Sequence, residues 1–566
     1  MLPMLYGIAV SSVLVSLTAA QTESAWTDSF NTQYQGMSAP LVRTLDTGGV
    51  VVGFESTEFG SSTDGVAVIR RLTENGDLAW EVTHSLERQK FAGLWYRQYL
   101  GDLDSGPDGA VAFVIVSEDS MEITMLEADG TQRWSTTMNP VLGPNYDRVS
   151  LVMAPDGDLL VAANEGWWAA YGAVRAEVWR LDSASGAVLW SVDQAPADNV
   201  RIAVDGANNT YVLVRPPAAT SRLRLTRYDS GGQPTGFVNL IASDYSEVLR
   251  CDDGGRCFTI TEGPGVRRLT SISPSLNIEW TETLPNDVGF NATLMADGHV
   301  VVRSGRLDVP LRRYSRFGTL LHATPPPYTD PFHYMQVAAS PNGNSIAMLA
   351  VNSNGSAVAC RAIIEERDPT GALVHSYEIP AGSSSCRIAE NVAVDDRANV
   401  YAIYVFGISG QNAFGATNKL LLAGEIGSQY CSPAVVNSTG QPASVRAFGS
   451  SSAADNNLSL LFRDLPPGST LLPVGSRMTG FVPMAGTSQG TLCLSGGVGR
   501  FDEPGEIRVA SSSGQAAVQL ELTQFPTPGG LITATAGETW NFQAWYRDAN
   551  PTVTSNFTDA VAVTLR

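Results

Sequence analysis

The chain has 566 residues, of which 43% are hydrophobic and 16% are charged, and its formal net charge is −20. This length exceeds that of one ordinary domain, and the apolar content suffices for a sizeable core. The negative charge argues against nucleic acid and anionic membranes as partners.

The first segment, residues 1–20, is apolar and ends in Leu17-Thr18-Ala19-Ala20 before Gln21. This pattern predicts a secretory signal peptide, and hence a protein that is secreted or displayed at the cell surface. An uncleaved anchor is the alternative. After removal of this segment, no stretch of the sequence is long and apolar enough to span a membrane.

A two-part pattern then recurs about every 50 residues between residues 22 and 427. One part is a tight turn followed by an apolar strand, as in residues 156–161. The other places a glycine four residues before an aromatic residue, as in residues 186–190. Short strands separated by Asp and Gly turns at this period predict an all-β fold with a β-propeller.

The number of blades follows from counting the two parts. The turn-and-strand part occurs eight times and the aromatic part seven times, at residues 76–80, 130–134, 186–190, 232–237, 276–280, 318–322 and 371–375. A composite blade resolves the mismatch, because the strand around Trp26 can complete the three strands of residues 392–424. Such a seam also removes the free edges of the ring. Eight blades are favoured and seven are the alternative.

The aromatic part of the repeat is best explained by packing between blades, since a large ring buries much area. His322 and His375 occupy the aromatic position of the repeat, here called the aromatic slot, and this favours a packing role over a catalytic one for both.

Three aspartates and three tryptophans are candidate ligand-binding residues. Asp102, Asp104 and Asp108 offer hard oxygen ligands, so calcium is a candidate cofactor, although Asp108 also belongs to a blade turn. Exposed tryptophans can stack on sugars, and the candidates are Trp167, Trp168 and Trp545, with packing as the alternative. Residues 486–490 match Gly-x-Ser-x-Gly, but no histidine follows them, so we interpret the segment as a turn.

Six cysteines are present, and in an exported chain an even number favours disulfides. Six cysteines allow fifteen connectivities. Sequence proximity suggests three pairs: Cys251 with Cys257, Cys360 with Cys386, and Cys431 with Cys493.

The sequence changes character at residue 430, and residues 430–566 read as a β-sandwich. Strict alternation near the end places Trp540, Phe542, Ala544 and Tyr546 on one face of a strand. The opposite face carries Thr539, Asn541, Gln543, Trp545 and Arg547, so we expect this strand to be half-buried.

This tail resembles a C-terminal module of large secreted proteins from planctomycetes and related bacteria. The resemblance rests on Tyr430-Cys431, on residues 437–440, on residues 492–506 and on residues 537–548. That module follows unrelated N-terminal domains, which implies a role in delivery, anchoring or adhesion.

The repeats are similar to those of quinoprotein-type propellers, with the best copy at residues 181–190. This family includes quinone-dependent dehydrogenases and non-enzymatic scaffolds. The enzymes need adjacent cysteines in a disulfide, and this chain has none. The resemblance therefore supports the fold and argues against the cofactor.

These observations predict a secreted, non-enzymatic binding or scaffold propeller with a C-terminal envelope-targeting or adhesion module. The expected partner is a protein or polysaccharide of the cell envelope or its surroundings. A propeller enzyme is the alternative, either a quinone-dependent dehydrogenase or a polysaccharide hydrolase or lyase, with Asp102 or Asp104 at a channel mouth. A third possibility is that the tail is a sorting signal that is removed after export.

Overall fold

A computed structural model describes residues 23–566 except 33–39, 46–47, 58–64, 92–93, 118–119, 139–145, 166–175, 195–197, 216–221, 241–244, 264–265, 286–289, 296, 305–310, 325–331, 342, 352–360, 380–386, 396–397, 408–412, 422–424, 503–505, 511–513 and 551. The regular elements of the described residues are all β-strands, apart from two short 3-10 turns at Ala453–Asp455 and Ala485–Thr487.

Eight four-stranded antiparallel sheets make up the first part of the chain. In chain order they are β2 (Leu41–Thr44), β3 (Val50–Thr57), β4 (Gly65–Leu72) and β5 (Leu78–Leu86); β8 (Tyr99–Ser105), β9 (Val111–Val116), β10 (Met121–Leu126) and β11 (Gln132–Met138); β12 (Tyr146–Met153), β13 (Leu159–Glu165), β14 (Ala176–Leu181) and β15 (Val188–Asp193); β16 (Asp198–Val204), β17 (Thr210–Arg215), β18 (Arg224–Tyr228) and β19 (Pro234–Asn239); β20 (Tyr245–Cys251), β21 (Cys257–Gly263), β22 (Val266–Ile272) and β23 (Ile278–Leu284); β24 (Phe290–Leu294), β25 (Val300–Ser304), β26 (Leu311–Tyr314) and β27 (Leu320–Thr324); β28 (Phe332–Ala339), β29 (Ser345–Val351), β30 (Arg361–Arg367) and β31 (Leu373–Ile379); and β32 (Arg387–Val394), β33 (Val400–Gly407) and β34 (Ala413–Leu421) with β1 (Glu23–Thr32). A small hairpin, β6 (Arg88–Phe91) with β7 (Leu94–Arg97), lies between the first two sheets in the chain.

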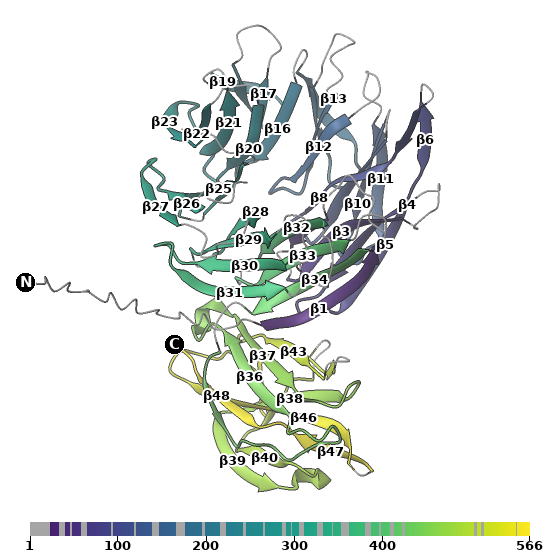
Figure 1. Cartoon of the computed structure of the whole chain (residues 1–566), viewed down its shortest axis with the longest axis vertical. Helices are drawn as coiled ribbons and strands as arrows, with labels where there is room; N and C mark the ends of the chain where they lie inside the picture. The colour runs from purple at the N-terminus through teal and green to yellow at the C-terminus, as the bar shows by residue number, and fades with distance from the viewer. Residues whose placement is uncertain are drawn as a thin grey trace, which may run out of the picture.

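The sheets form a ring, and β1 completes the last of them (Figure 1). The first strand of each sheet contacts the first strand of the next, and β32 contacts β2, so the sequence of contacts is circular. The predicted seam is confirmed, since Trp26 of β1 is paired with Lys419 of β34. The inner strands are apolar throughout, as in β9, where all six residues are buried, because neighbouring sheets cover both of their faces.

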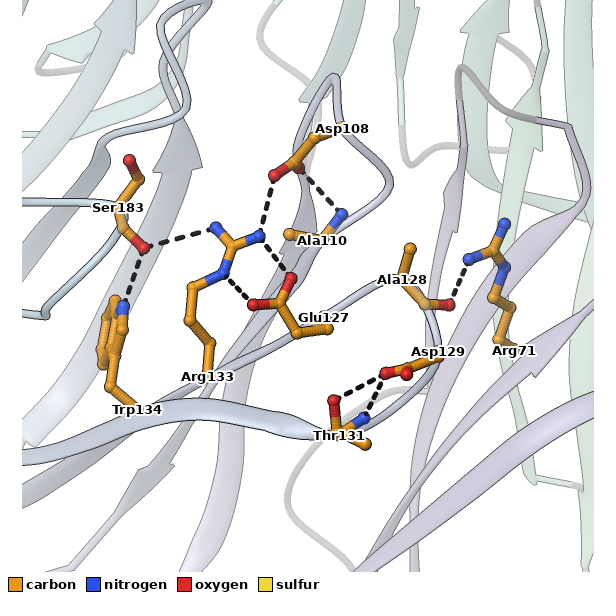
Figure 2. Close-up of polar contacts among 10 residues, drawn as sticks. All are labelled: Arg71, Asp108, Ala110, Glu127, Ala128, Asp129, Thr131, Arg133, Trp134 and Ser183. Carbon is orange, nitrogen blue, oxygen red and sulfur yellow. Dashed lines mark hydrogen bonds and ion pairs between the residues drawn. The ribbon is translucent and has the colours of Figure 1, made fainter.

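The repeat aromatics join neighbouring sheets. The indole Nε1 of Trp134 donates to the carbonyl oxygen of Ser183 in the next sheet at 2.9 Å (Figure 2). Trp80, Trp190 and Trp280 make the same bond, with Ala128, Ser230 and Arg316. Each ring also lies against the glycine that follows in the partner turn; a Cβ on Gly186 would be 2.6 Å from Trp134. His322 lies against Gly371 in the same way, in accord with its predicted packing role.

One copy of the pattern departs from the prediction. Phe237 is not in the aromatic slot, and 54% of it is exposed, with the Arg224 guanidinium 4.4 Å from its ring centroid. Gly236 occupies the slot instead, and a Cβ there would meet Leu276 at 2.9 Å. Leu276 takes the place of the turn glycine with a φ of 62°. The aromatic ring that this sheet lacks is thus replaced by the Leu276 side chain, which comes from the turn of the next sheet.

The remaining strands form two packed sheets and two hairpins. The larger sheet contains β35 (Ser428–Tyr430), β48 (Ala560–Thr564), β46 (Thr539–Ala549), β38 (Thr470–Ser476) and β41 (Gly499–Arg500), with β42 (Arg508–Val509) beside β38 and β47 (Val553–Phe557) beside β46. The smaller sheet contains β36 (Ser444–Gly449), β37 (Leu458–Arg463) and β43 (Ala516–Leu520). The hairpins are β39 (Met478–Pro483) with β40 (Thr491–Ser495), and β44 (Phe525–Thr527) with β45 (Gly530–Ile532).

The core of this sandwich contains the four alternating residues of β46, which are at most 1% exposed: Trp540, Phe542, Ala544 and Tyr546. The expectation of a polar, exposed opposite face is wrong for Asn541 and Gln543, which are 2% and 0% exposed. Gln543 Oε1 accepts from the Cys493 amide at 2.9 Å, and its Nε2 donates to the Thr491 carbonyl at 2.9 Å. Hairpin β39–β40 therefore covers that face, and the buried amide is satisfied by hydrogen bonds.

Two of the three predicted disulfides lie within the described residues, and both are formed. Cys251 pairs with Cys257 across the β20–β21 hairpin, and Cys431 pairs with Cys493 in the sandwich. The third predicted pair, Cys360 with Cys386, lies outside the described residues.

A buried lysine joins the ring to the sandwich. Lys419 of β34 is 1% exposed, and its Nζ donates to Gln519 Oε1 of β43 at 2.7 Å. The backbone N–H of Gln519 donates to Asn75 Oδ1 at 3.0 Å. Arg508 forms an ion pair with Asp77. The module therefore packs on the seam where the ring closes (Figure 1).

Candidate functional site

A cavity of about 630 Å³ lies where the first strands of the eight sheets meet. Its wall contains residues from β2, β8, β12, β16, β20, β24, β28 and β32, one strand from each sheet. Among the described residues that line it, none is aromatic. Hydrogen bonds and charge, rather than ring stacking, are therefore what this wall offers to a ligand.

Strand alternation explains which side chains reach the cavity. At one register position, three residues before the first turn, every sheet has a buried apolar residue that is at most 7% exposed: Val42, Leu103, Leu151, Ile202, Leu249, Ala292, Val337 and Val392. The next position along each strand varies, and all of its residues except Ala338 line the cavity: Arg43, Asp104, Val152, Ala203, Arg250, Thr293, Ala338 and Ala393. The fold thus demands apolar residues at the first position but not at the second.

One side of the cavity carries two carboxylates that share a guanidinium. Arg43 Nη2 lies 3.2 Å from Asp102 Oδ1, and Arg43 Nε lies 3.4 Å from Asp104 Oδ1. The other oxygens accept backbone amides of the next sheet at 2.9 Å, from Leu151 for Asp102 and from Met153 for Asp104. These two aspartates therefore tie three consecutive sheets together.

The pKa of Asp104 is raised above its usual value, chiefly because the carboxyl is desolvated by burial. The Arg43 charge and the Met153 amide act in the opposite direction and favour the ionised form. Asp104 is thus a carboxyl that takes up a proton more readily than an exposed aspartate.

Arg250 lies on β20, four sheets away from Arg43 and so on the opposite side of the ring. Its side chain is accessible in the cavity, and within the described part of the chain its guanidinium makes one hydrogen bond, from Nη1 to the Leu249 carbonyl at 2.9 Å. Desolvation by the surrounding walls lowers the pKa of this guanidinium, and the positive charge of Arg43 lowers it further, whereas the charges of Asp102 and Asp104 act in the opposite direction. An arginine remains charged under all ordinary conditions.

Three carboxamides lie on the sheets between Arg250 and Arg43. They are Asn291 on β24, Gln336 on β28 and Asn391 on β32. Asn291 Nδ2 donates to Gln336 Oε1, and Asn391 Oδ1 accepts from the Val392 amide at 2.9 Å. The amide NH₂ groups of Gln336 and Asn391 make no hydrogen bond to any described residue, so they can bind a ligand.

Asp108 is separated from the other two predicted calcium ligands. It lies in the β8–β9 turn, where Oδ1 accepts a hydrogen bond from the Ala110 amide at 3.0 Å and Oδ2 accepts one from Arg133 Nη2 at 2.9 Å (Figure 2). Arg133 also holds Glu127 at 2.6 Å. In the described part of the chain, no three His, Cys, Asp or Glu side chains lie where they could hold a metal ion together.

Of the three predicted stacking residues, the structure describes Trp545. Trp545 is half-buried, and the guanidinium of Arg547 covers its ring at 4.8 Å from the centroid. Trp167 and Trp168 lie outside the described residues. Ser488 of the Gly-x-Ser-x-Gly segment is buried, and its hydroxyl donates to the Ser555 carbonyl at 2.9 Å, as befits a turn.

The sequence suggested Asp102 and Asp104 as residues at a channel mouth, and both line the cavity. It did not suggest Arg43, Arg250 or the three carboxamides. They are far apart in the chain and follow no motif. The signal that marks them is positional, because each precedes a blade turn by two or four residues.

Fold and cavity together define the class: a β-propeller that carries a β-sandwich module and a polar cavity on the axis of its ring. No family model and no curated protein matches the chain. Among the described residues, no helix is long and apolar enough to cross a membrane.

Several solved structures resemble the chain. The Dos1 propeller has a TM-score of 0.46 and 11% identity, covering 70% of this chain and 94% of that one. The WD40 repeats of RRP9 have a TM-score of 0.37 and 12% identity, covering 59% and 97%. A catalytically inactive virginiamycin B lyase from Staphylococcus aureus with quinupristin has a TM-score of 0.33 and 12% identity, covering 59% and 98%. At these identities the likeness extends to the fold alone.

Proposed function

We propose that the protein is exported and binds a ligand in the central cavity without transforming it. A volume of about 630 Å³ is within the usual range for ligand pockets, about 300–1,000 Å³. The observation that carries the proposal is the state of the two carboxylates. Asp102 and Asp104 accept hydrogen bonds from Arg43 and from backbone amides, whereas a general acid or base must be able to reach the proton that it transfers.

The C-terminal module is proposed to attach the propeller to the cell envelope. Hairpin β39–β40 and the turn after β39 lie at the end of the module remote from the ring (Figure 1). Met478, Phe481 and Met484 are 59%, 73% and 72% exposed there, and residues 478–499 carry no charge. Large exposed apolar side chains in one place are typical of contact surfaces.

The binding proposal is tested by thermal shift of the full chain against calcium, pyrroloquinoline quinone and a panel of cell-wall and algal polysaccharides. A ligand that binds the folded state raises the melting temperature by mass action. We expect a shift with a saccharide or envelope component and no release of product from it. A shift with quinone and calcium together would contradict the proposal.

The attachment proposal is tested by co-sedimentation of the full chain with envelope preparations. Phe481→Ser is expected to reduce sedimentation severalfold. Val553→Ser, at a residue that is 86% exposed on β47, serves as the control and should sediment like the unaltered chain. Equal sedimentation of all three proteins would argue against attachment through this hairpin.

A polysaccharide hydrolase or lyase is the second candidate, and one observation favours it. Asp102 and Asp104 lie together in the cavity, and burial raises the pKa of Asp104, as in carboxyls that act as general acids. If a polysaccharide is cleaved by the full chain and Asp104→Asn abolishes cleavage without loss of binding, the enzyme proposal replaces the first one.

A further inference from the structure

The hydrogen-bonding groups that remain unused in the cavity include one charged group, the guanidinium of Arg250. The carboxylates of Asp102 and Asp104 already accept from Arg43 and from backbone amides. The carbonyl oxygens of Gln336 and Asn391 accept from Asn291 and the Val392 amide. Among the described lining side chains, what is left to a ligand is most of the Arg250 guanidinium, the amide NH₂ groups of Gln336 and Asn391, the carbonyl oxygen of Asn291, and the hydroxyls of Ser150 and Thr293.

The charges in the cavity are also unevenly placed. Arg43 lies with both aspartates on one side of the ring, so its charge is compensated locally. Arg250 lies on the opposite side, and no carboxylate of the described residues forms an ion pair with it. The charges of Asp102 and Asp104 act on Arg250 from across the cavity, but neither contacts it, and a positive charge in a partly desolvated space without a contacting carboxylate attracts an anion.

We propose that the cavity binds an oxygen-rich anion, with Arg250 holding its charged group and the amides of Gln336 and Asn391 donating to its neutral oxygens. This inference rests on the proposed function and adds the chemical class of the ligand. The charged group is a carboxylate, sulfate or phosphate, because the planar guanidinium donates two parallel hydrogen bonds to each of these.

The composition of the wall narrows the ligand further. Since no described lining residue is aromatic, the ligand is not held by stacking on a ring, and its oxygens must supply the contacts. An acidic saccharide or a hydroxy acid meets this requirement. A neutral sugar would bring no negative charge to Arg250. A cation would be repelled by Arg250 on one side, and on the other it would meet Asp102 and Asp104, which already accept hydrogen bonds from Arg43 and backbone amides.

The test is calorimetric titration of the full chain with four anions and one neutral sugar. Trigalacturonate supplies a carboxylate on a saccharide, citrate a carboxylate without a sugar, a sulfated disaccharide a sulfate, and inorganic phosphate a phosphate; cellotriose is the neutral reference. We expect at least one anion to bind and cellotriose not to bind. Binding should weaken when salt is raised from about 50 to about 500 mM, because salt screens the attraction.

Arg250→Met keeps the aliphatic stem and should weaken anion binding at least tenfold. Asn391→Leu should weaken it severalfold, which provides a second reading if the first variant folds poorly. Arg316→Met removes an exposed guanidinium on an outer turn and should bind like the unaltered chain. If Arg250→Met binds the anion as well as the unaltered chain, or if none of the four anions binds, the inference is overturned.

The two proposals fail differently. If cellotriose or an envelope polysaccharide binds, and Arg250→Met leaves that binding unchanged, the anion site is refuted and the binding function stands. Turnover of a bound anion would refute the non-enzymatic function and leave the anion site standing.

Discussion

Two turn glycines of one sheet provide a matched test of the role of the repeat tryptophans. Gly157 and Gly186 have φ values of 89° and 70°, so alanine at either position must adopt a left-handed backbone that costs about 1–2 kcal/mol. A Cβ on Gly157 would meet nothing nearer than Ser183 at 3.7 Å, whereas a Cβ on Gly186 would lie 2.6 Å from Trp134. Overpacking of this kind adds about 1–3 kcal/mol.

Gly157→Ala is therefore expected to lower the free energy of unfolding of the ring by about 1–2 kcal/mol and Gly186→Ala by about 2–5 kcal/mol. Urea denaturation followed by far-UV circular dichroism measures both, since the midpoint shifts while the slope is unchanged. In a Trp134→Ala background the extra cost of Gly186→Ala should vanish, because the ring that it meets is gone.

Equal losses for the two glycines, or an unchanged difference in the Trp134→Ala background, would refute the packing interpretation. The repeat aromatics would then be free for another role, such as ligand stacking. The expected result would instead confine ligand recognition to residues outside the repeat, and above all to the cavity.

Three further predictions concern the sandwich and its junction with the ring. Burial raises the pKa of Asp559 to about 6, above the unfolded value of 3.8, so the cost of keeping the ionised carboxylate buried is absent below pH 3.8 and complete above pH 6. We therefore expect the module to lose about 3 kcal/mol of stability as the pH rises through that window. Urea titrations at several pH values measure this loss, and Asp559→Asn should abolish the pH dependence. Gln519→Leu removes the acceptor at 2.7 Å from the buried Lys419 ammonium and leaves the Glu74 carbonyl at 3.3 Å, so it should cost about 1.5–3 kcal/mol, with partial recovery when Lys419→Met is added. No loss in the single variant would contradict the role of this contact. Reduction of the Cys431–Cys493 disulfide, which closes a loop of 62 residues, should destabilise the module by about 4 kcal/mol, and identical unfolding with and without reductant would refute this.

The ring could be predicted from sequence because its determinants are local. A turn such as Asp156-Gly157 and the apolar strand after it lie within a few residues of each other, and they recur at a near-constant period. The seam could be predicted too, since counting the two parts of the repeat left one strand missing, and β1 supplies it. In the tail, alternation identified the four core residues of β46.

What could not be predicted depends on contacts between distant segments. Asn541 and Gln543 have the pattern of an exposed face, but hairpin β39–β40 covers that face and supplies hydrogen bonds to Gln543, while Asn541 donates to the Ser476 carbonyl of β38. In the copy at residues 232–237 the sequence suggested Phe237 for the aromatic slot, but Gly236 occupies the slot, and Leu276 from the next sheet packs there. In both cases the local pattern is intact and tertiary packing changes its meaning.

The cavity illustrates the same limit and also shows why function can be sought there. A residue that the ring needs for folding must have similar character in all eight sheets, as the buried apolar position of the first strands does. The neighbouring position carries arginine, aspartate, threonine, valine or alanine, depending on the sheet, so folding does not dictate it. Arg250 stands among small residues at that position and opposite a guanidinium that is already paired. A charge that the fold does not require, placed where the fold leaves space, is best explained by a ligand that needs it.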